Sequence, residues 1–123
     1  MSEITIILND LRPVSWNVLK RMHRGAWASE VETAKMLVLS ELRQMYNGDQ
    51  PPIFSHIVDI SIVCYFDKRP YDSSNIPLKL YEDGLIGLLI KDDSIKYVRK
   101  TCTEARIDRK KPRLEITITE VAQ

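Results

Sequence analysis

Acidic and basic side chains between positions 68 and 96 have the types and spacing of a metal site. Asp72 closes a polar loop just ahead of a predicted helix, and Asp92 and Asp93 follow the end of that helix. Mg²⁺ takes oxygen ligands and is commonly bound by a few carboxylates together with water and phosphate oxygens. Such an ion can polarise a phosphoryl oxygen and favour hydroxide formation from bound water. These residues therefore indicate a candidate site for phosphodiester chemistry.

Two side chains of the predicted helix could complete that site. Lys79 stands one helical turn after Asn75, so its charge can face the Asp72 end and offset negative charge in a transition state. Asp83 lies further along and could help bridge to Asp93. A helix of about 15 residues holds its ends about 20 Å apart, so the carboxylates can meet only if the loops fold back or the helix is shorter. Acids at helix ends are also common as caps and solvated loops, and residue types alone leave both interpretations open.

Cations are concentrated in two segments, although the net charge is only +1. The segment 11–26 holds cations and no acid: Arg12, Lys20, Arg21 and Arg24. The segment 94–113 holds eight cations against two acids: Lys96, Arg99, Lys100, Arg106, Arg109, Lys110, Lys111 and Arg113. Positive segments on a nearly neutral chain suit a polyanion bound at one face. The alternative is a set of solvated strand and loop edges.

Alternating apolar residues predict four strands. They are expected at 4–8, 58–66, about 95–104 and about 114–121. Val63 interrupts the polar side of the second strand, which indicates a central position with partial burial on both faces. The last two strands are separated by the cation-rich segment 106–112, which is expected to be a turn, so we expect them to form a hairpin.

A first helix is expected to begin at Ser29. Ser29 and Glu32 form a capping box, and Asn47-Gly48 provides a stop. One apolar face recurs at helical spacing: Val31, Ala34, Val38, Leu42 and Met45. The segment 9–28 before this helix is predicted to be a long loop, whose Trp16 and Trp27 could pack as anchors or stack on unpaired bases.

A second helix is expected from Asn75 to about Leu89, with Ser74 or Asn75 as its cap and Pro77 in the first turn. The chain then has the order β-α-β-α-β-β, which predicts an α/β (α+β) domain with a mixed sheet and two helices packed on it. A length of 123 residues favours a single domain over 1–123.

Composition places the chain among soluble proteins. No apolar run approaches the ~20 residues that a membrane span needs, and Met1-Ser2-Glu3 is acidic where a signal peptide would be basic. We therefore expect a cytoplasmic protein. Cys64 and Cys102 both fall in strand-like segments outside any C-x-x-C pair, and are predicted to be buried free thiols.

The order of these residues resembles the signature of the RusA family of Holliday-junction resolvases. The matching residues are Asp72-x-x-Asn75, Lys79, Asp83-Gly84-Leu85 and Asp92-Asp93. The family signature has an Asp-x-Asp-Asn start, a Lys in the next helix, an Asp-x-Leu and a paired Asp before a strand. The order of elements is also similar, with Arg12-Pro13 in a basic loop after the first strand. Ser74 stands where the family has its second Asp, and Lys79 lies one position later than the simplest family spacing.

The resemblance implies a homodimeric endonuclease that binds four-way DNA junctions and nicks two opposing strands with Mg²⁺ or Mn²⁺. Asp72 and Asp93 would be metal ligands, with Asp92 beside them. Asp83 could be recruited where Ser74 offers only a hydroxyl, and Lys79 would stabilise charge. The expected DNA contacts combine the first basic segment with the pair before the motif: Arg12, Lys20, Arg21, Arg24, Lys68 and Arg69.

Two other functions stay open on the sequence. One is a DNA-junction-binding protein of the same fold whose catalysis is impaired by Ser74. The other is a small non-enzymatic interaction protein whose charged loops are simply solvated. No membrane partner and no small-molecule cofactor are expected in any of the three.

Overall fold

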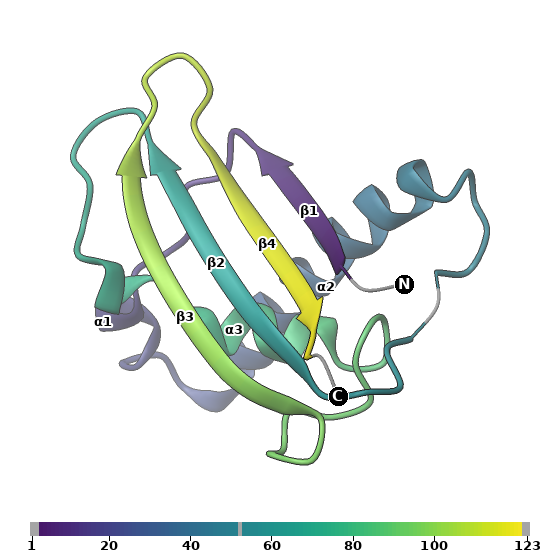
Figure 1. Cartoon of the computed structure of the whole chain (residues 1–123). Helices are drawn as coiled ribbons and strands as arrows, with labels where there is room; N and C mark the ends of the chain where they lie inside the picture. Colours follow the sequence, from purple (N-terminus) through teal and green to yellow (C-terminus); the bar gives the residue numbers. More distant parts are fainter. Residues whose placement is uncertain (1–2, 52, 122–123) are drawn as a thin grey trace.

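A four-stranded mixed sheet forms the centre of the molecule in the computed structural model, which describes residues 3–51 and 53–121 (Figure 1). The strands are β1 (Glu3–Asn9), β2 (Val58–Phe66), β3 (Val98–Ile107) and β4 (Arg113–Glu120). Their spatial order is β1-β4-β2-β3, with β4 antiparallel to both neighbours and β3 parallel to β2. The expected α+β class with a mixed sheet is confirmed. The expectation of a cytoplasmic protein rested in part on Met1 and Ser2, which lie outside the described residues.

The predicted hairpin of the last two strands is wrong. β2 lies between β3 and β4, so that Ile62 is paired with Thr103 on one side and with Ile116 on the other. The physical reason lies in β2 itself, in which buried and half-buried residues alternate along the whole strand. A strand of that kind gains most when it has a neighbour at each edge. The turn 108–112 is long enough to cross the end of β2, so β3 and β4 can lie on opposite sides of it. The predicted central position of the 58–66 strand is confirmed.

The helices cover one face of the sheet, and the other face is uncovered by helices (Figure 1). Apolar residues of β1, β2 and β4 point to the helices; Ile6, Ile62 and Ile116 are fully buried there. Polar residues point the other way, where the Thr5 and Thr117 hydroxyls lie 3.1 Å apart. One-sided burial explains the strict alternation that made these strands predictable.

No helix in the described ranges combines the length and apolar character that a membrane crossing needs.

The first long helix begins earlier than its capping box. α2 spans Arg24–Met45, and the His23 ring nitrogen Nδ1 accepts hydrogen bonds from the N–H groups of Gly25 (3.1 Å) and Ala26 (3.4 Å). The predicted start at Ser29 is therefore wrong, because an imidazole can satisfy the free N–H groups of the first turn as a hydroxyl would. The predicted end is close, with Gly48 at φ 87°.

The predicted long loop 9–28 contains helical structure. α1 (Trp16–Leu19) forms a single turn, and the start of α2 occupies the last residues of the segment. Trp16 and Trp27 meet edge to face with centroids 5.9 Å apart and pack against the core. Of the two roles considered for these tryptophans, the structure therefore supports packing.

The second predicted helix is much shorter than expected. A single 3₁₀ turn, η1 (Ser73–Asn75), precedes α3, which spans only Leu78–Leu85. Neither Ser74 nor Asn75 caps the helix, because Pro77 occupies the cap position. The chain turns back after Leu85, where Gly87 has φ 85° and its N–H bonds to the Ile90 carbonyl at 2.8 Å. The early end of α3 allows the following segment to return toward the helix start.

The two cysteines differ in their surroundings. Cys64 is a buried free thiol as predicted, and burial raises its pKa to about 11. Cys102 is exposed, and its predicted burial is wrong. The reason is that β3 is an edge strand, and most of the side chains along it are exposed.

Gly84→Val is expected to destabilise the protein by about 1–3 kcal/mol, the usual cost of overpacking. A Cβ at Gly84 would lie 3.3 Å from the backbone nitrogen of Lys35 and 3.4 Å from the Ala34 Cβ, so α2 and α3 would have to separate. Chemical denaturation measures the loss. Ala28→Val, at an exposed position of α2, is the control and should cost much less. Equal losses in the two variants would contradict close packing of the helices at Gly84.

Candidate active site

The ammonium group of Lys79 lies between two carboxylates. Its Nζ is 2.9 Å from Asp83 Oδ1, one helical turn further along α3, and it donates a hydrogen bond to Asp93 Oδ2. Asp93 belongs to the segment that returns after α3, so it reaches the first turn of that helix. Three of the predicted site residues therefore meet at one point, which we call the acid–lysine site (Lys79, Asp83 and Asp93).

The acid–lysine site is strongly polarised but open to solvent. The hydrogen bond from Lys79 holds the pKa of Asp93 below its ordinary value, and the same bond raises the pKa of Lys79. The side chain of Lys79 is 50% exposed, and those of Asp83 and Asp93 are 21% and 26% exposed. Ion pairs at this exposure contribute at most about 1 kcal/mol to folding stability. Because water already competes for these groups, a dissolved ion or an anionic ligand can reach them.

Glu82 is a member of this neighbourhood that sequence reasoning missed. It is the one charged side chain that is buried within the described ranges. Burial is the main cause of its raised pKa, and the nearby Asp93 charge raises it further while Lys79 lowers it. The signal available in the sequence was its spacing of three residues from Lys79, which also fits an ordinary surface pair.

Asp72 and Asp92 lie outside the acid–lysine site. Asp72 occupies the cap position of η1 without making a side-chain cap, and η1 is tied to β3 by the Thr103 hydroxyl, which donates to the Ser73 carbonyl at 2.9 Å. Among the described residues, no hydrogen bond or ion pair joins Asp72 to Asp83 or Asp93. Asp92 is exposed beside Asp93. The described ranges also contain no group of three or more His, Cys, Asp or Glu side chains arranged to hold a metal ion.

The pair Asp83–Asp93 nevertheless fits the donor chemistry of Mg²⁺. This ion is commonly bound by one or two carboxylates, with water and substrate phosphates completing its shell. Both carboxylates face the position that the Lys79 ammonium occupies. A divalent cation held there would therefore take the place of the Lys79 ammonium between the two carboxylates.

Arg12 joins the first predicted basic segment to the loop that carries Lys68 and Arg69. Its guanidinium donates to the backbone carbonyls of Lys68 (3.1 Å) and Arg69 (2.8 Å) and lies over the rings of Phe66 and Tyr71. Arg12 thus holds the loop after β2. The side chains of Lys68 and Arg69 are exposed on that loop, at the edge of a cavity of about 450 Å³ that Arg12 also lines.

The other predicted DNA contacts lie around the junction of α1 and α2. Lys20 and Arg21 follow α1, and Arg24 begins α2; all three are exposed. α1 lies beside η1, the turn that Asp72 precedes (Figure 1). The first basic segment therefore borders the Asp72 side of the candidate site.

No known protein family matches this chain, and no curated protein matches it. Its function therefore has to be inferred from the side chains and their arrangement.

Glu82→Gln and Asp93→Asn are expected to change stability in opposite directions at pH 8. Glu82 has a raised pKa, so the stability its neutral form provides is lost as the pH rises through that pKa; the amide avoids this loss and stabilises the fold. Asp93 has a lowered pKa, so it provides stability above about pH 4 that disappears as the pH falls through its folded pKa; Asp93→Asn removes that contribution.

Urea unfolding at pH 8 and pH 3 measures both effects. The two differences from the unmodified protein should shrink at pH 3. Glu32→Gln, at an exposed position of α2, is the control and should change little at either pH. Differences of the same sign, or differences independent of pH, would show that Glu82 and Asp93 do not have these electrostatic environments.

Proposed function

We propose that the protein is an endonuclease that uses Mg²⁺ or Mn²⁺ to resolve four-way (Holliday) junctions by paired phosphodiester hydrolysis. The observation that carries the proposal is the convergence of Asp83 and Asp93 on Lys79. Support also comes from the resemblance of the residues from Asp72 to Asp93 to the RusA signature. A RusA-like fold is part of the proposal, and the mixed sheet with helices on one face is compatible with it.

Each side chain of the site has a distinct role in this proposal. Asp83 and Asp93 would hold the cation, and Asp72 with Asp92 would join them if the η1 turn moves closer. When bound, the ion supplies Lewis-acid polarisation of the scissile phosphate. Lys79, released from its carboxylates, would donate a hydrogen bond to a phosphate oxygen that gains negative charge in the transition state.

Exposed cations would hold the DNA over a surface that extends from the candidate site to the end of β2. Those proposed for this contact are Lys20, Arg21, Arg24, Lys68 and Arg69, with Arg12 holding their loop in place. A homodimer with two-fold symmetry would match the symmetry of a four-way junction and bring one site to each of two strands. We place this activity in the cytoplasm.

A DNA-junction-binding protein without cleavage is the second candidate. Two observations favour it: Ser74 offers a hydroxyl where a carboxylate is expected, and Lys79 already neutralises Asp93. This candidate predicts junction binding that survives EDTA, and new cleavage on Ser74→Asp. A non-enzymatic interaction protein, the third candidate, predicts no salt-dependent binding to any nucleic acid.

Cleavage of a synthetic four-way junction in Mg²⁺ tests the first candidate. The expected products are paired nicks, and Asp93→Asn or Lys79→Met should lower the rate by about 100-fold or more, as the loss of a transition-state contact does. Asp49→Asn makes the same charge change at an exposed acid near the end of α2 and should leave the rate unchanged. An uncut junction at saturating protein, or equal loss in all three variants, would rule out the proposed site.

A further inference from the structure

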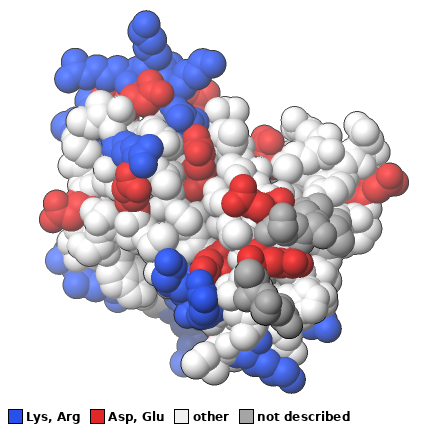
Figure 2. Space-filling model, in the orientation of Figure 1, with Lys and Arg blue, Asp and Glu red and all other residues white. Residues whose placement is uncertain are grey.

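Three consecutive cations project from the turn between β3 and β4, which we call the basic turn (residues 108–112). Arg109, Lys110 and Lys111 are all exposed, and Lys and Arg side chains gather over this end of the sheet (Figure 2). No ion pair within the described ranges involves any of these three side chains. Their charges are therefore available to an outside partner.

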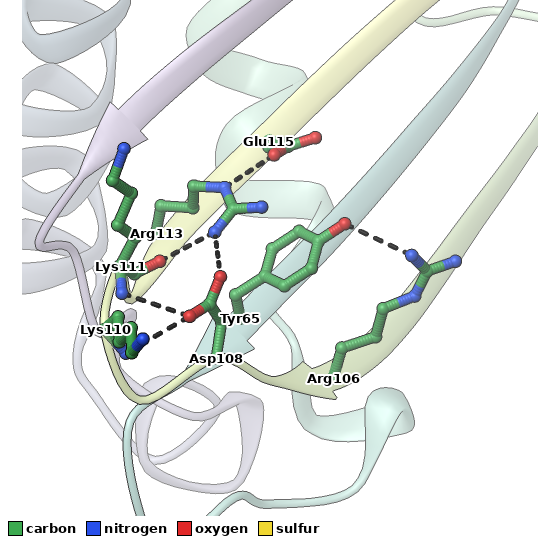
Figure 3. A network of polar contacts seen from close by, with 7 residues as sticks. All are labelled: Tyr65, Arg106, Asp108, Lys110, Lys111, Arg113 and Glu115. Carbon is green, nitrogen blue, oxygen red and sulfur yellow. Dashed lines mark hydrogen bonds and ion pairs between the residues drawn. The ribbon is translucent and has the colours of Figure 1, made fainter.

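Asp108 is the one acid of the basic turn, and its hydrogen bonds fix the shape of the turn. Asp108 Oδ1 accepts hydrogen bonds from the backbone N–H groups of Lys110 and Lys111, each at 3.1 Å (Figure 3). Its Oδ2 accepts from Arg113 at 2.9 Å, and this bond holds the pKa of Asp108 below its ordinary value. Arg113 also donates to the Lys111 carbonyl at 2.7 Å. Asp108 shares Arg113 with Glu115, and it forms no ion pair with any of the three projecting cations within the described ranges.

The base of the basic turn is anchored to three strands. The Arg113 guanidinium lies 3.8 Å from the centroid of the Tyr65 ring on β2, and the Tyr65 hydroxyl accepts from Arg106 on β3 at 3.2 Å (Figure 3). Backbone bonds join Asp10, just after β1, to Pro112 and join Asp108 to Phe66, each at 2.9 Å. A turn whose backbone is held in this way loses less backbone entropy when it binds a ligand.

The basic turn borders a second set of exposed cations. Pro112 lines the same cavity of about 450 Å³ as Arg12, Lys68 and Arg69. The basic turn and the Lys68–Arg69 loop thus flank one hollow at the end of β2. Asp10 and Asp67 also line this cavity, so its interior carries both signs of charge. The cations on its two rims suit an extended polyanion, which can contact several of them at once, better than a single small anion inside it.

β3 separates the basic turn from the acid–lysine site. Asp93 comes shortly before β3 begins, and the basic turn follows its end. A strand of 10 residues spans about 33 Å, so the basic turn at the end of β3 lies well away from the segment that carries Asp93 before its start. We infer that the basic turn binds the phosphate backbone of a duplex DNA arm at a second contact, remote from the site of cleavage. The choice of DNA as the ligand rests on the proposed function.

Binding of a labelled four-way junction in EDTA over a range of salt concentrations tests the inference without any cleavage. The turn variant is R109Q/K110Q/K111Q, and R43Q is the control, which removes a charge at an exposed position of α2 outside both basic segments. The turn variant should bind at least 10-fold more weakly. Its plot of log affinity against log salt should be less steep by about 0.9 for each lost phosphate contact. The control should keep the original slope.

Each outcome has a separate meaning for the two proposals. Equal loss in the turn and control variants, or none in either, would overturn the inference while leaving cleavage at the acid–lysine site possible. Loss of junction binding in the turn variant alone, in a protein that never cuts, would support DNA binding by the basic turn and reject the proposed nuclease activity. Failure of the unmodified protein to bind DNA would reject both.

Polyglutamate of matched charge that binds the basic turn, where DNA does not, would point to an acidic protein partner instead and overturn the inference. Thermal unfolding should be alike in all three proteins, because every substituted side chain is exposed.

Discussion

The contact of the Lys79 ammonium with two carboxylates organises the chemistry of this molecule. Asp83 reaches Lys79 through helix geometry alone, but Asp93 reaches it only because α3 ends at Leu85 and the chain turns back at Gly87. A longer helix would have carried the second acid away from the first. The candidate site therefore depends on where one short helix stops, and the same contact offers a place where a divalent cation can compete with an ammonium group.

The central strand β2 determines where the charged segments of the chain meet. Because β3 and β4 pair with opposite edges of β2, the turn between them crosses its end and lies beside the loop that carries Lys68 and Arg69. Arg12 bonds to the backbone of that loop from the segment after β1. Cations distant in sequence are thus gathered at one end of the sheet, while the acids lie near the start of β3.

Local patterns predicted the parts of the fold that local forces decide. One-sided burial of β1, β2 and β4 produces strict alternation, and the apolar face of α2 recurs at Ala34, Val38 and Leu42, all buried as expected. The hairpin and the burial of Cys102 could not be predicted, because strand pairing is decided by distant partners. The capping box at Ser29 is a sound local signal, but the His23 imidazole satisfies the helix start earlier.

The candidate site was predictable to the extent that order along the chain determines proximity. Lys79, Asp83 and Asp93 were selected from their spacing, and the structure brings them together. Asp72 was selected by the same reasoning, but η1 is bonded to β3 and not to the acids. Glu82 escaped notice because its burial depends on how α3 packs, which the sequence does not express.

Binding of Mn²⁺ observed by NMR is the sharpest test of a cation site at Asp83 and Asp93, since the paramagnetic ion broadens the signals of nearby amides without any need for DNA. We expect the amides of Asp83 and Asp93 to broaden first, and we expect Asp93→Asn to abolish this pattern while Asp49→Asn leaves it intact. Broadening that begins at unrelated surface acids, or none at millimolar ion, would contradict the claim that these two carboxylates form a divalent cation site.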